Sequence, residues 1–516
     1  MKFFGQIFFL IFALQIFNHQ TVAKGYNYEE NCENDICQSL QLTENDTLRH
    51  HNREEKIITE SLSFKRSSIP IINSKLFRHF SNLRELDLRD TKIEKFKPDS
   101  FKNLINLQIL VLSQNYLINL PENGFYNNKN LQFLWLDFNN IEYIEPGSFK
   151  NLNKLQYLSL EGNQITELPN NIFDDLTSLY GLYLQSNKLE ILDDDLFKNC
   201  NNLNNVHIED NNLKIISNNI FAGKILEYID ISFNQIEDFK LIFESIGTLK
   251  AEHAFKSGEV EIYGDVNHLD FSNNDNIVGI NIENITMLEN FLWSGKNAIK
   301  LDFLKDASNL KQLSFSSPSI SVLPSTFFST MTELIFLNIS GCQLSYIHPN
   351  SFNYLDNVEA LDLSNNKLNE LDIHLFLPMT KLKHLIIRGN KFLCSKISSG
   401  IRDYFEQNSI FVESDPLPLN QLKDPLNIFE GILCYNYKDE IQNDESQTDI
   451  SDNESEITNK FKAEISELRQ HLQIIVQHFE GKFNRIQKEI DEIKRRNDII
   501  NNVNDKFWNQ ISVSTP

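Results

Sequence analysis

Residues 131–154 read LQFLWLDFNNIEYIEPGSFKNLNK, and the same arrangement of apolar residues returns along most of the chain. An aliphatic residue stands at Leu86, Leu110, Leu134, Leu158, Leu182 and Val206, each 24 positions after the last. Inside the quoted stretch Leu134 and Leu136 alternate with Trp135, which is the pattern of a short strand with one buried face. The interval therefore predicts one strand in every unit of 24 residues.

The full unit fits the pattern L-x-x-L-x-L-x-x-N-x-L, which is typical of leucine-rich-repeat solenoids. It predicts an α/β repeat fold, a solenoid whose curved parallel sheet lies on the concave face, with about 15 units between Leu62 and Ile387. From Leu249 to Phe291 the spacing shortens. We interpret this region as repeat drift with one or two degenerate strands, in preference to a functional break in curvature.

Two further columns recur with the strands. Asparagine follows the strand at Asn115, Asn139, Asn163, Asn187, Asn211, Asn234, Asn274, Asn366 and Asn390. Phenylalanine recurs at Phe101, Phe125, Phe149, Phe173, Phe197 and Phe221. A buried amide is costly unless it is hydrogen-bonded, so we expect an asparagine ladder that satisfies backbone groups, and a stacked aromatic spine on the convex side. Both columns are structural and predict no cofactor site.

The chain begins with features of an exported protein. Residues 1–23 combine Lys2, an apolar run and a small-residue end, which predicts a signal peptide and a secreted, extracellular location. No later segment offers the roughly 18 consecutive apolar residues of a membrane span. The formal net charge of -23 opposes binding to nucleic acid.

The cysteines divide into two groups. We predict a bridge between Cys32 and Cys37 in an N-terminal cap (24–60), and a bridge between Cys394 and Cys434 in a C-terminal cap (394–437), with the repeats (61–393) between them. Four terminal cysteines allow three pairings, and this pairing closes each bridge within one cap. Cys200 and Cys342 stand in repeat slots, so we expect buried thiols. No cysteine or histidine cluster has metal-ligand spacing.

Four N-x-S/T sequons are plausible glycan acceptors in an exported chain: Asn45, Asn284, Asn338 and Asn453. Asn338 lies between Leu337 and Ile339, so its side chain should point from the concave face. A glycan there would shield the C-terminal half of that face.

The outward positions of the N-terminal strands are rich in aromatic residues. We predict a partner-binding surface at Phe133, Trp135, Tyr157, Tyr180 and Tyr183, accompanied by Phe138, Tyr228, Phe233 and the acids Asp137, Glu161, Glu209 and Asp230. Trp135 and Tyr183 are the expected anchors. The alternative is that neighbouring rings simply cover one another as cross-strand pairs.

Past the second cap the composition changes. Residues 438–456 are acidic and nearly free of apolar side chains, which predicts a flexible linker. Residues 457–511 carry a heptad rhythm with Asn497 and Asn504 at a positions, which predicts a coiled coil that forms a homodimer or heterodimer. The alternative is an amphipathic helix folded back on the solenoid.

This order of parts resembles the secreted leucine-rich-repeat immune proteins of mosquitoes and related flies. The resemblance implies a haemolymph protein that dimerises with a relative and holds a complement-like thioester protein. It also implies a cysteine that links two chains near the cap or the helices, and this sequence has none after Cys434.

A different class of function is an extracellular matrix or adhesion protein, or a carrier of growth factors, built on the same solenoid. An enzyme finds little support, because no H-E-x-x-H, G-x-S-x-G or P-loop motif appears.

Overall fold

The structure is a computed structural model that describes residues 32–33, 36–38, 60–65, 67–78, 80–297, 299–415, 428–429 and 432–435. The chain divides into two units, Met1–Asn436 and Tyr437–Pro516, and the described residues lie in the first. The predicted signal peptide, linker and coiled coil, with Asn45, Asn453, Asn497 and Asn504, fall outside the described residues.

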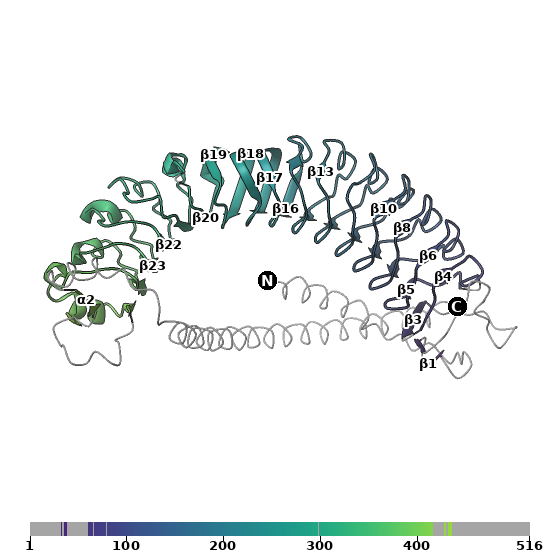
Figure 1. Cartoon of the computed structure of the whole chain (residues 1–516), viewed down its shortest axis with the longest axis horizontal. Coiled ribbons are helices and arrows are strands. Elements are labelled where there is room, and N and C mark those ends of the chain that lie inside the picture. Colours follow the sequence, from purple (N-terminus) through teal and green to yellow (C-terminus); the bar gives the residue numbers. More distant parts are fainter. Residues whose placement is uncertain are drawn as a thin grey trace, which may run out of the picture. The chain divides into compact units, whose positions relative to one another are not determined.

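Each repeat contributes one strand to a parallel sheet on the concave side of this unit (Figure 1). In order along the sheet these strands are β3 (Ser61–Lys65), β5 (Glu85–Asp87), β7 (Ile109–Val111), β9 (Phe133–Trp135), β11 (Tyr157–Ser159), β12 (Gly181–Tyr183), β14 (Asn205–His207), β16 (Ile225–Asp230), β17 (Ile236–Lys250), β18 (Phe255–Phe271), β20 (Asn290–Ser294), β21 (Gln312–Ser316), β22 (Phe336–Asn338), β23 (Ala360–Asp362) and β24 (His384–Ile386). Leu134 stands opposite Leu110 and Leu158, which is the predicted 24-residue register. Leu134 and Leu136 are fully buried, whereas Trp135 between them is half-buried.

The convex segments contain little helix. Short parallel pairs join β4 (Ile71–Ile72) to β6 (Lys95–Phe96), β8 (Asn119–Leu120) to β10 (Tyr143–Ile144) and β13 (Ile191–Leu192) to β15 (Ile215–Ile216). Short 3-10 helices occur at η2 (Ile285–Met287), η3 (Leu301–Asp306), η4 (Pro349–Phe352), η5 (Ile373–Leu375) and η6 (Cys394–Lys396). The helical part of the predicted α/β class is therefore wrong for the described repeats. The convex segment closes instead through tight turns such as Ser148 N to Glu145 O at 3.0 Å.

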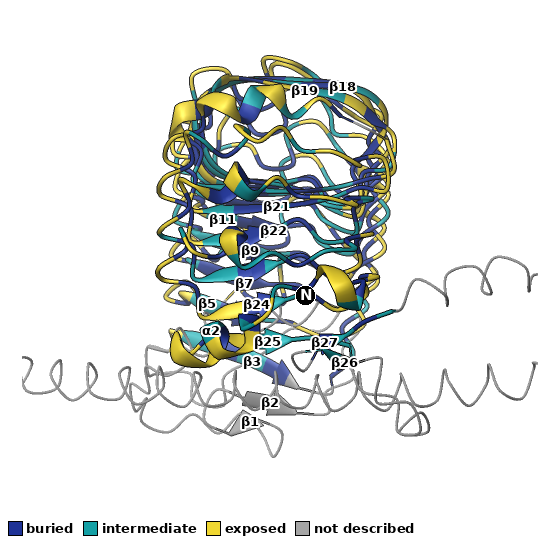
Figure 2. Cartoon of the chain, turned by 90° about the vertical axis from the view of Figure 1, so that its left-hand side faces the viewer, coloured by how far each residue is buried: buried dark blue, intermediate teal, exposed yellow. Residues whose placement is uncertain are grey.

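The phenylalanine spine is confirmed. Phe125 stacks on Phe149 with 6.4 Å between ring centroids and 6° between planes, and Phe197 stacks on Phe221 at 5.5 Å. The stack begins one unit earlier than predicted, because Phe77 also stacks on Phe101. Exposed residues gather on the turns at the sides of the coils, whereas the strands of the concave sheet are mostly buried or half-buried (Figure 2).

The asparagine ladder is also confirmed. Asn163 is 2% exposed, and its Oδ1 accepts from the backbone N of Ile141 at 2.9 Å. Its Nδ2 donates to the carbonyl oxygens of Leu136 at 3.0 Å and Leu160 at 2.9 Å. One amide thereby satisfies backbone groups of its own unit and of the preceding unit.

The middle repeats differ from the prediction. Leu249 stands opposite Leu269, an interval of 20, and Leu269 opposite Phe291, an interval of 22. The strands here are not degenerate, since β17 has 15 residues and β18 has 17. Their convex halves also pair in parallel and continue to β19 (Ile277–Asn284).

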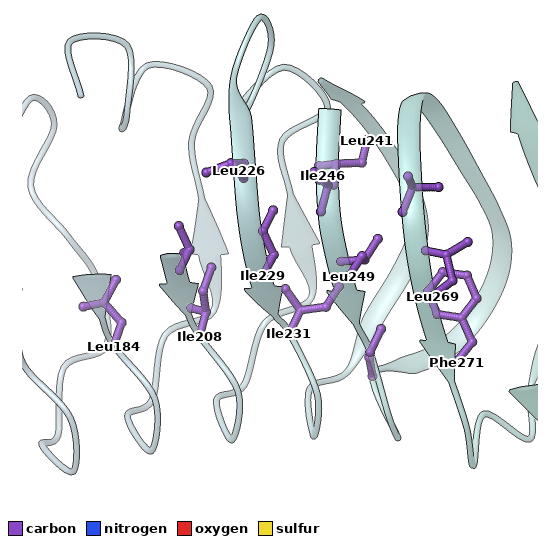
Figure 3. Close-up of a cluster of buried hydrophobic side chains, with 14 of the residues drawn as sticks. Leu184, Ile208, Leu226, Ile229, Ile231, Leu241, Ile246, Leu249, Leu269 and Phe271 are labelled. Carbon is purple, nitrogen blue, oxygen red and sulfur yellow. The ribbon is translucent and has the colours of Figure 1, made fainter. Parts of the chain in front are cut away.

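The middle strands are long because the units that contain them have fewer residues. A unit with four fewer residues cannot form the turns of the convex side, so that segment extends and hydrogen-bonds to its neighbours. Gly264, with φ of +139°, gives β18 a conformation that other residues rarely adopt. Figure 3 shows that one continuous core includes Leu184 and Ile208 of the longer units and Leu249 and Leu269 of the shorter units.

Both ends of the sheet are covered. Before the repeats, β1 (Cys32–Glu33) pairs antiparallel with β2 (Ile36–Gln38), and the backbone register sets Cys32 opposite Cys37. The bridge between those two cysteines stays a prediction. After the repeats come α2 (Ile401–Gln407), β25 (Phe411–Glu413), and the pair β26 (Ile428–Phe429) and β27 (Ile432–Leu433).

The other four cysteines agree with the predictions of one bridge and two buried thiols. A disulfide joins Cys394 to Cys434, with 5.1 Å between the Cα atoms. Cys200 and Cys342 are buried and not disulfide-bonded. Within the part of the chain that the structure describes, no helix has the length and apolarity needed to cross a lipid bilayer.

We predict that Asn163→Leu lowers the free energy of unfolding by about 1 to 3 kcal/mol, because it leaves the Ile141 N–H and two carbonyl groups without their partner. Chemical denaturation followed by circular dichroism measures the change. Asn140→Leu, at an exposed neighbouring position, is the control. Equal stability of the two variants would contradict the structural role of the ladder.

Candidate functional site

The outward positions of β9 to β16 carry a continuous series of rings. We call this series, together with Tyr180 directly before β12, the concave patch; it comprises Phe133, Trp135, Tyr157, Tyr180, Tyr183, His207 and Tyr228. The structure thus brings together all five residues that the sequence predicted for partner binding. His207 was missed, although its place between two tyrosine-bearing strands was readable from the 24-residue interval.

The rings lie on one another across the strands. Phe133 and Tyr157 stack with 5.3 Å between centroids and 4° between planes. Tyr157 contacts Tyr180 at 5.7 Å, and Trp135 contacts Tyr183 at 6.5 Å. These contacts are of the cross-strand kind that stabilises a sheet, so part of the aromatic surface serves the fold.

Two small residues allow this arrangement. Ser159 pairs with Trp135 on one side and Tyr183 on the other, yet those rings meet at 6.5 Å although their strands are two spacings of about 4.8 Å apart. The rings therefore lean toward each other over β11, and Ser159 is fully buried although it faces outward. A Cβ at Gly181 would lie 2.7 Å from Cδ1 of Tyr157, so only glycine leaves room for that ring.

At the C-terminal end of the patch, His207 lies between the rings of Tyr183 and Tyr228. His207 stacks on Tyr183 with 4.9 Å between centroids and lies 5.0 Å from Tyr228. The Tyr228 hydroxyl donates to Asp230 at 3.0 Å, and Asp230 also pairs with Lys250 at 3.3 Å. The last ring of the series is thereby held by a hydrogen bond.

Carboxylates lie beside the rings. Asp137 accepts from the Ser113 hydroxyl at 2.7 Å, and Glu161 accepts from Nε2 of Gln185 at 2.8 Å. Glu209 lies 3.6 Å from Nδ1 of His207. The sequence identified these acids but assigned them no partners.

Burial changes the ionisation of Tyr183 in the patch and of Glu161 beside it. The pKa of Glu161 is raised to about 7, chiefly by burial and then by the negative charges of Asp137 and Glu209. Burial likewise raises the pKa of Tyr183 to about 12, so the phenol stays neutral and keeps its proton. The acids therefore interact with one another as well as with the rings.

Phe138 lies at the margin of the patch in the left-handed conformation that this slot has in most units. Its φ is +55°, a left-handed value that costs a bulky residue free energy, and its side chain is 42% exposed. Asn273 and Asn365 fill the same slot of later units with φ of +59° and +54°. Glutamine, serine and aspartate fill the slot in other units, so the repeat does not require a phenylalanine there, although the Phe138 ring lies over Gly162.

Two of the predicted glycan acceptors are described. Asn338 ends β22, and its Oδ1 accepts from the backbone N of Ser340 at 2.8 Å. Asn284 ends β19 and donates to Asp265 at 2.7 Å. Glycosylation at either position stays a prediction. In the described ranges, no three His, Cys, Asp or Glu side chains gather as metal ligands.

Comparison with known proteins bears on the fold. The leucine rich repeat family model matches residues 81–141, 129–189, 177–236 and 337–392. A chain from the crystal structure of the LRIM1/APL1C complex matches with a TM-score of 0.54 and 19% identity, covering 89% of this chain and 79% of that one. The crystal structure of the APL1 leucine-rich repeat domain matches with a TM-score of 0.50 and 17% identity, covering 78% and 97%. These matches establish a leucine-rich-repeat solenoid.

We predict that Glu161→Gln stabilises the protein above pH 7 and has little effect near pH 4.5. The folded pKa of about 7 lies above the ordinary 4.5, so the stability that protonated Glu161 contributes is present at low pH and is lost as the pH rises through 7. The shift corresponds to at most about 3 kcal/mol, and partial exposure reduces this to about 1 to 2 kcal/mol.

Thermal or denaturant midpoints at pH 4.5 and pH 8 measure the difference. Glu167→Gln, at an exposed position outside the patch, is the matched control. The same gain for Glu161→Gln at both pH values would refute the burial argument.

Proposed function

We propose that this solenoid is a secreted, non-enzymatic scaffold that binds a protein partner through the concave patch. The observation that carries the proposal is the continuous ring series from Phe133 to Tyr228, with carboxylates beside it. Large aromatic side chains lose little conformational entropy for the area they bury, and they dominate protein interfaces. Concave faces of solenoids are the usual place for such contacts.

The exposed ring of Phe138 and the signs of an extracellular location add support. Phe138 keeps an exposed ring at a left-handed position where asparagine would serve the fold better. The Cys394–Cys434 disulfide suits an oxidising compartment, as does the predicted signal peptide.

We propose further that the partner is a complement-like thioester protein and that the scaffold serves innate immunity. The support is the order of parts in the sequence, namely capped repeats followed by the predicted coiled coil. The fold it shares with a chain of the LRIM1/APL1C complex is consistent with a role in a protein assembly.

We predict that Trp135→Ala combined with Tyr183→Ala weakens partner binding by at least about 2 kcal/mol, roughly 30-fold in Kd. Phe138→Asn should also weaken binding while leaving the melting temperature unchanged or higher, because the substitution relieves the left-handed strain. The partner is captured from body fluid on the full chain, identified by mass spectrometry, and its Kd is then measured for each variant.

Tyr143→Ala is the control, since Tyr143 is equally aromatic and 49% exposed but lies in β10, away from the concave sheet. If all these variants bind alike, the concave patch is structural only. Recovery of matrix or cell-surface proteins in place of a thioester protein would favour the adhesion or carrier alternative.

We propose that residues 457–511 pair two chains, of the same protein or of a relative. An apolar stripe this long is unfavourable in water, and Asn497 and Asn504 penalise registers in which they lack a polar mate. We predict a dimer in sedimentation at micromolar concentration for the full chain, and a folded monomer when the chain ends before Thr458. If the full chain stays monomeric alone and after mixing with relatives, the pairing role is wrong.

A further inference from the structure

The carboxylates beside the concave patch have few cationic partners: Arg89 acts on Asp137 from beyond ion-pair distance, and Nδ1 of His207 lies 3.6 Å from Glu209. In the described part of the chain, no lysine or arginine nitrogen lies within ion-pair distance of Asp137, Glu161 or Glu209. Asp230, one strand further on, differs because Lys250 lies 3.3 Å away. Glu161 and Glu209 are close enough that the charge of Glu209 raises the pKa of Glu161. Negative charge is thus concentrated beside the patch, and Glu161 has no lysine or arginine at ion-pair distance among the described residues.

The same place holds polar oxygens without hydrogen-bond partners. These atoms are Oγ of Ser159, Oε1 of Gln185 and Oε2 of Glu209, each buried on the outward side of successive units. Ser159 as a whole is 0% exposed. Nε2 of Gln185 already donates one hydrogen bond to Glu161, and Oε1 of Gln185 is an unused acceptor. Leaving buried acceptors unsatisfied costs free energy, and native proteins rarely do so without a functional reason.

Aromatic faces adjoin these oxygens. Trp135 and Tyr183 lean together over Ser159, and His207 stacks on the far side of the group near Glu209. Ring faces attract cations, and carboxylates and carbonyl oxygens accept hydrogen bonds from them. A guanidinium group meets both demands, because it is planar, stacks on aromatic rings and carries five N–H donors. A lysine ammonium offers three donors and stacks poorly.

We propose that the concave patch receives an arginine side chain of the protein partner, stacked against Trp135 and Tyr183 and hydrogen-bonded to Glu161 and Glu209. The inference rests on the proposed function and specifies the chemistry of the partner at that site. The incoming cation neutralises carboxylates that otherwise destabilise the free solenoid. Their attraction to the cation therefore contributes to the free energy of binding.

The test uses the full chain and blocked tripeptides Ala-X-Ala, in which X is arginine, lysine or citrulline, the last being a neutral analogue of arginine. Binding is measured by saturation-transfer NMR at pH 8, where Glu161 is ionised, and at low ionic strength. We expect the arginine peptide to bind most tightly, the lysine peptide at least threefold more weakly, and the citrulline peptide at least tenfold more weakly.

Charge-matched variants separate the site from general attraction to an acidic protein. Glu161→Gln with Glu209→Gln should weaken the arginine peptide at least tenfold. Glu142→Gln with Glu167→Gln removes the same charge from exposed positions outside the patch and should change binding less than twofold. Equal binding of the arginine and citrulline peptides, or equal losses in the two double variants, would overturn the inference.

Failure of the arginine inference and failure of the proposed function give different results. If Phe138→Asn and the Trp135 and Tyr183 variants abolish partner capture while no arginine peptide binds, the scaffold function stands and the arginine inference is wrong. If partner capture is unaffected by those variants but the arginine peptide binds at Glu161 and Glu209, the inference holds for an isolated cation and the proposed docking function fails.

Discussion

The buried asparagine amide is the interaction on which the rest of the solenoid depends. Asn211 accepts from the backbone N of Leu189 and donates to the carbonyl oxygens of Leu184 and Ile208, each at 3.0 Å. A turn buried between two units would otherwise leave these groups unsatisfied, at a cost that a single repeat cannot offset. Because each amide joins two units, no unit is complete alone, and stability is shared between neighbours.

The middle units satisfy their buried backbone groups partly by strand pairing. Ala254 fills the ladder slot of one shortened unit and offers no side-chain hydrogen bond, yet Asn274 of the next unit still accepts from its backbone N at 2.9 Å. The extended convex halves of β17 and β18 satisfy their backbone by parallel pairing instead of by turns. Register along the concave sheet is therefore continuous across a change of repeat length, and the outward positions keep their alignment.

The buried leucine, phenylalanine and asparagine columns supply the packing and hydrogen bonds of the repeats. The outward positions of the strands can therefore vary without disrupting the core. In the N-terminal half those positions combine contacting rings with the buried carboxylate Glu161, and Phe138 adds an exposed ring. Ring contacts stabilise the sheet, whereas a buried carboxylate opposes folding when it is ionised. Such a surface agrees with the binding role proposed above.

The sequence alone determined the 24-residue interval, the asparagine and phenylalanine columns and the aromatic outward positions, because each depends on residue type at a spacing along one chain. Only the tertiary structure decided that the short middle units extend into strands, since that outcome depends on how much chain remains to close a coil. It alone revealed that Ser159 lies beneath Trp135 and Tyr183, and that Glu161 titrates near neutral pH. Those properties arise from side chains two strands apart, whose distances and burial no local pattern encodes.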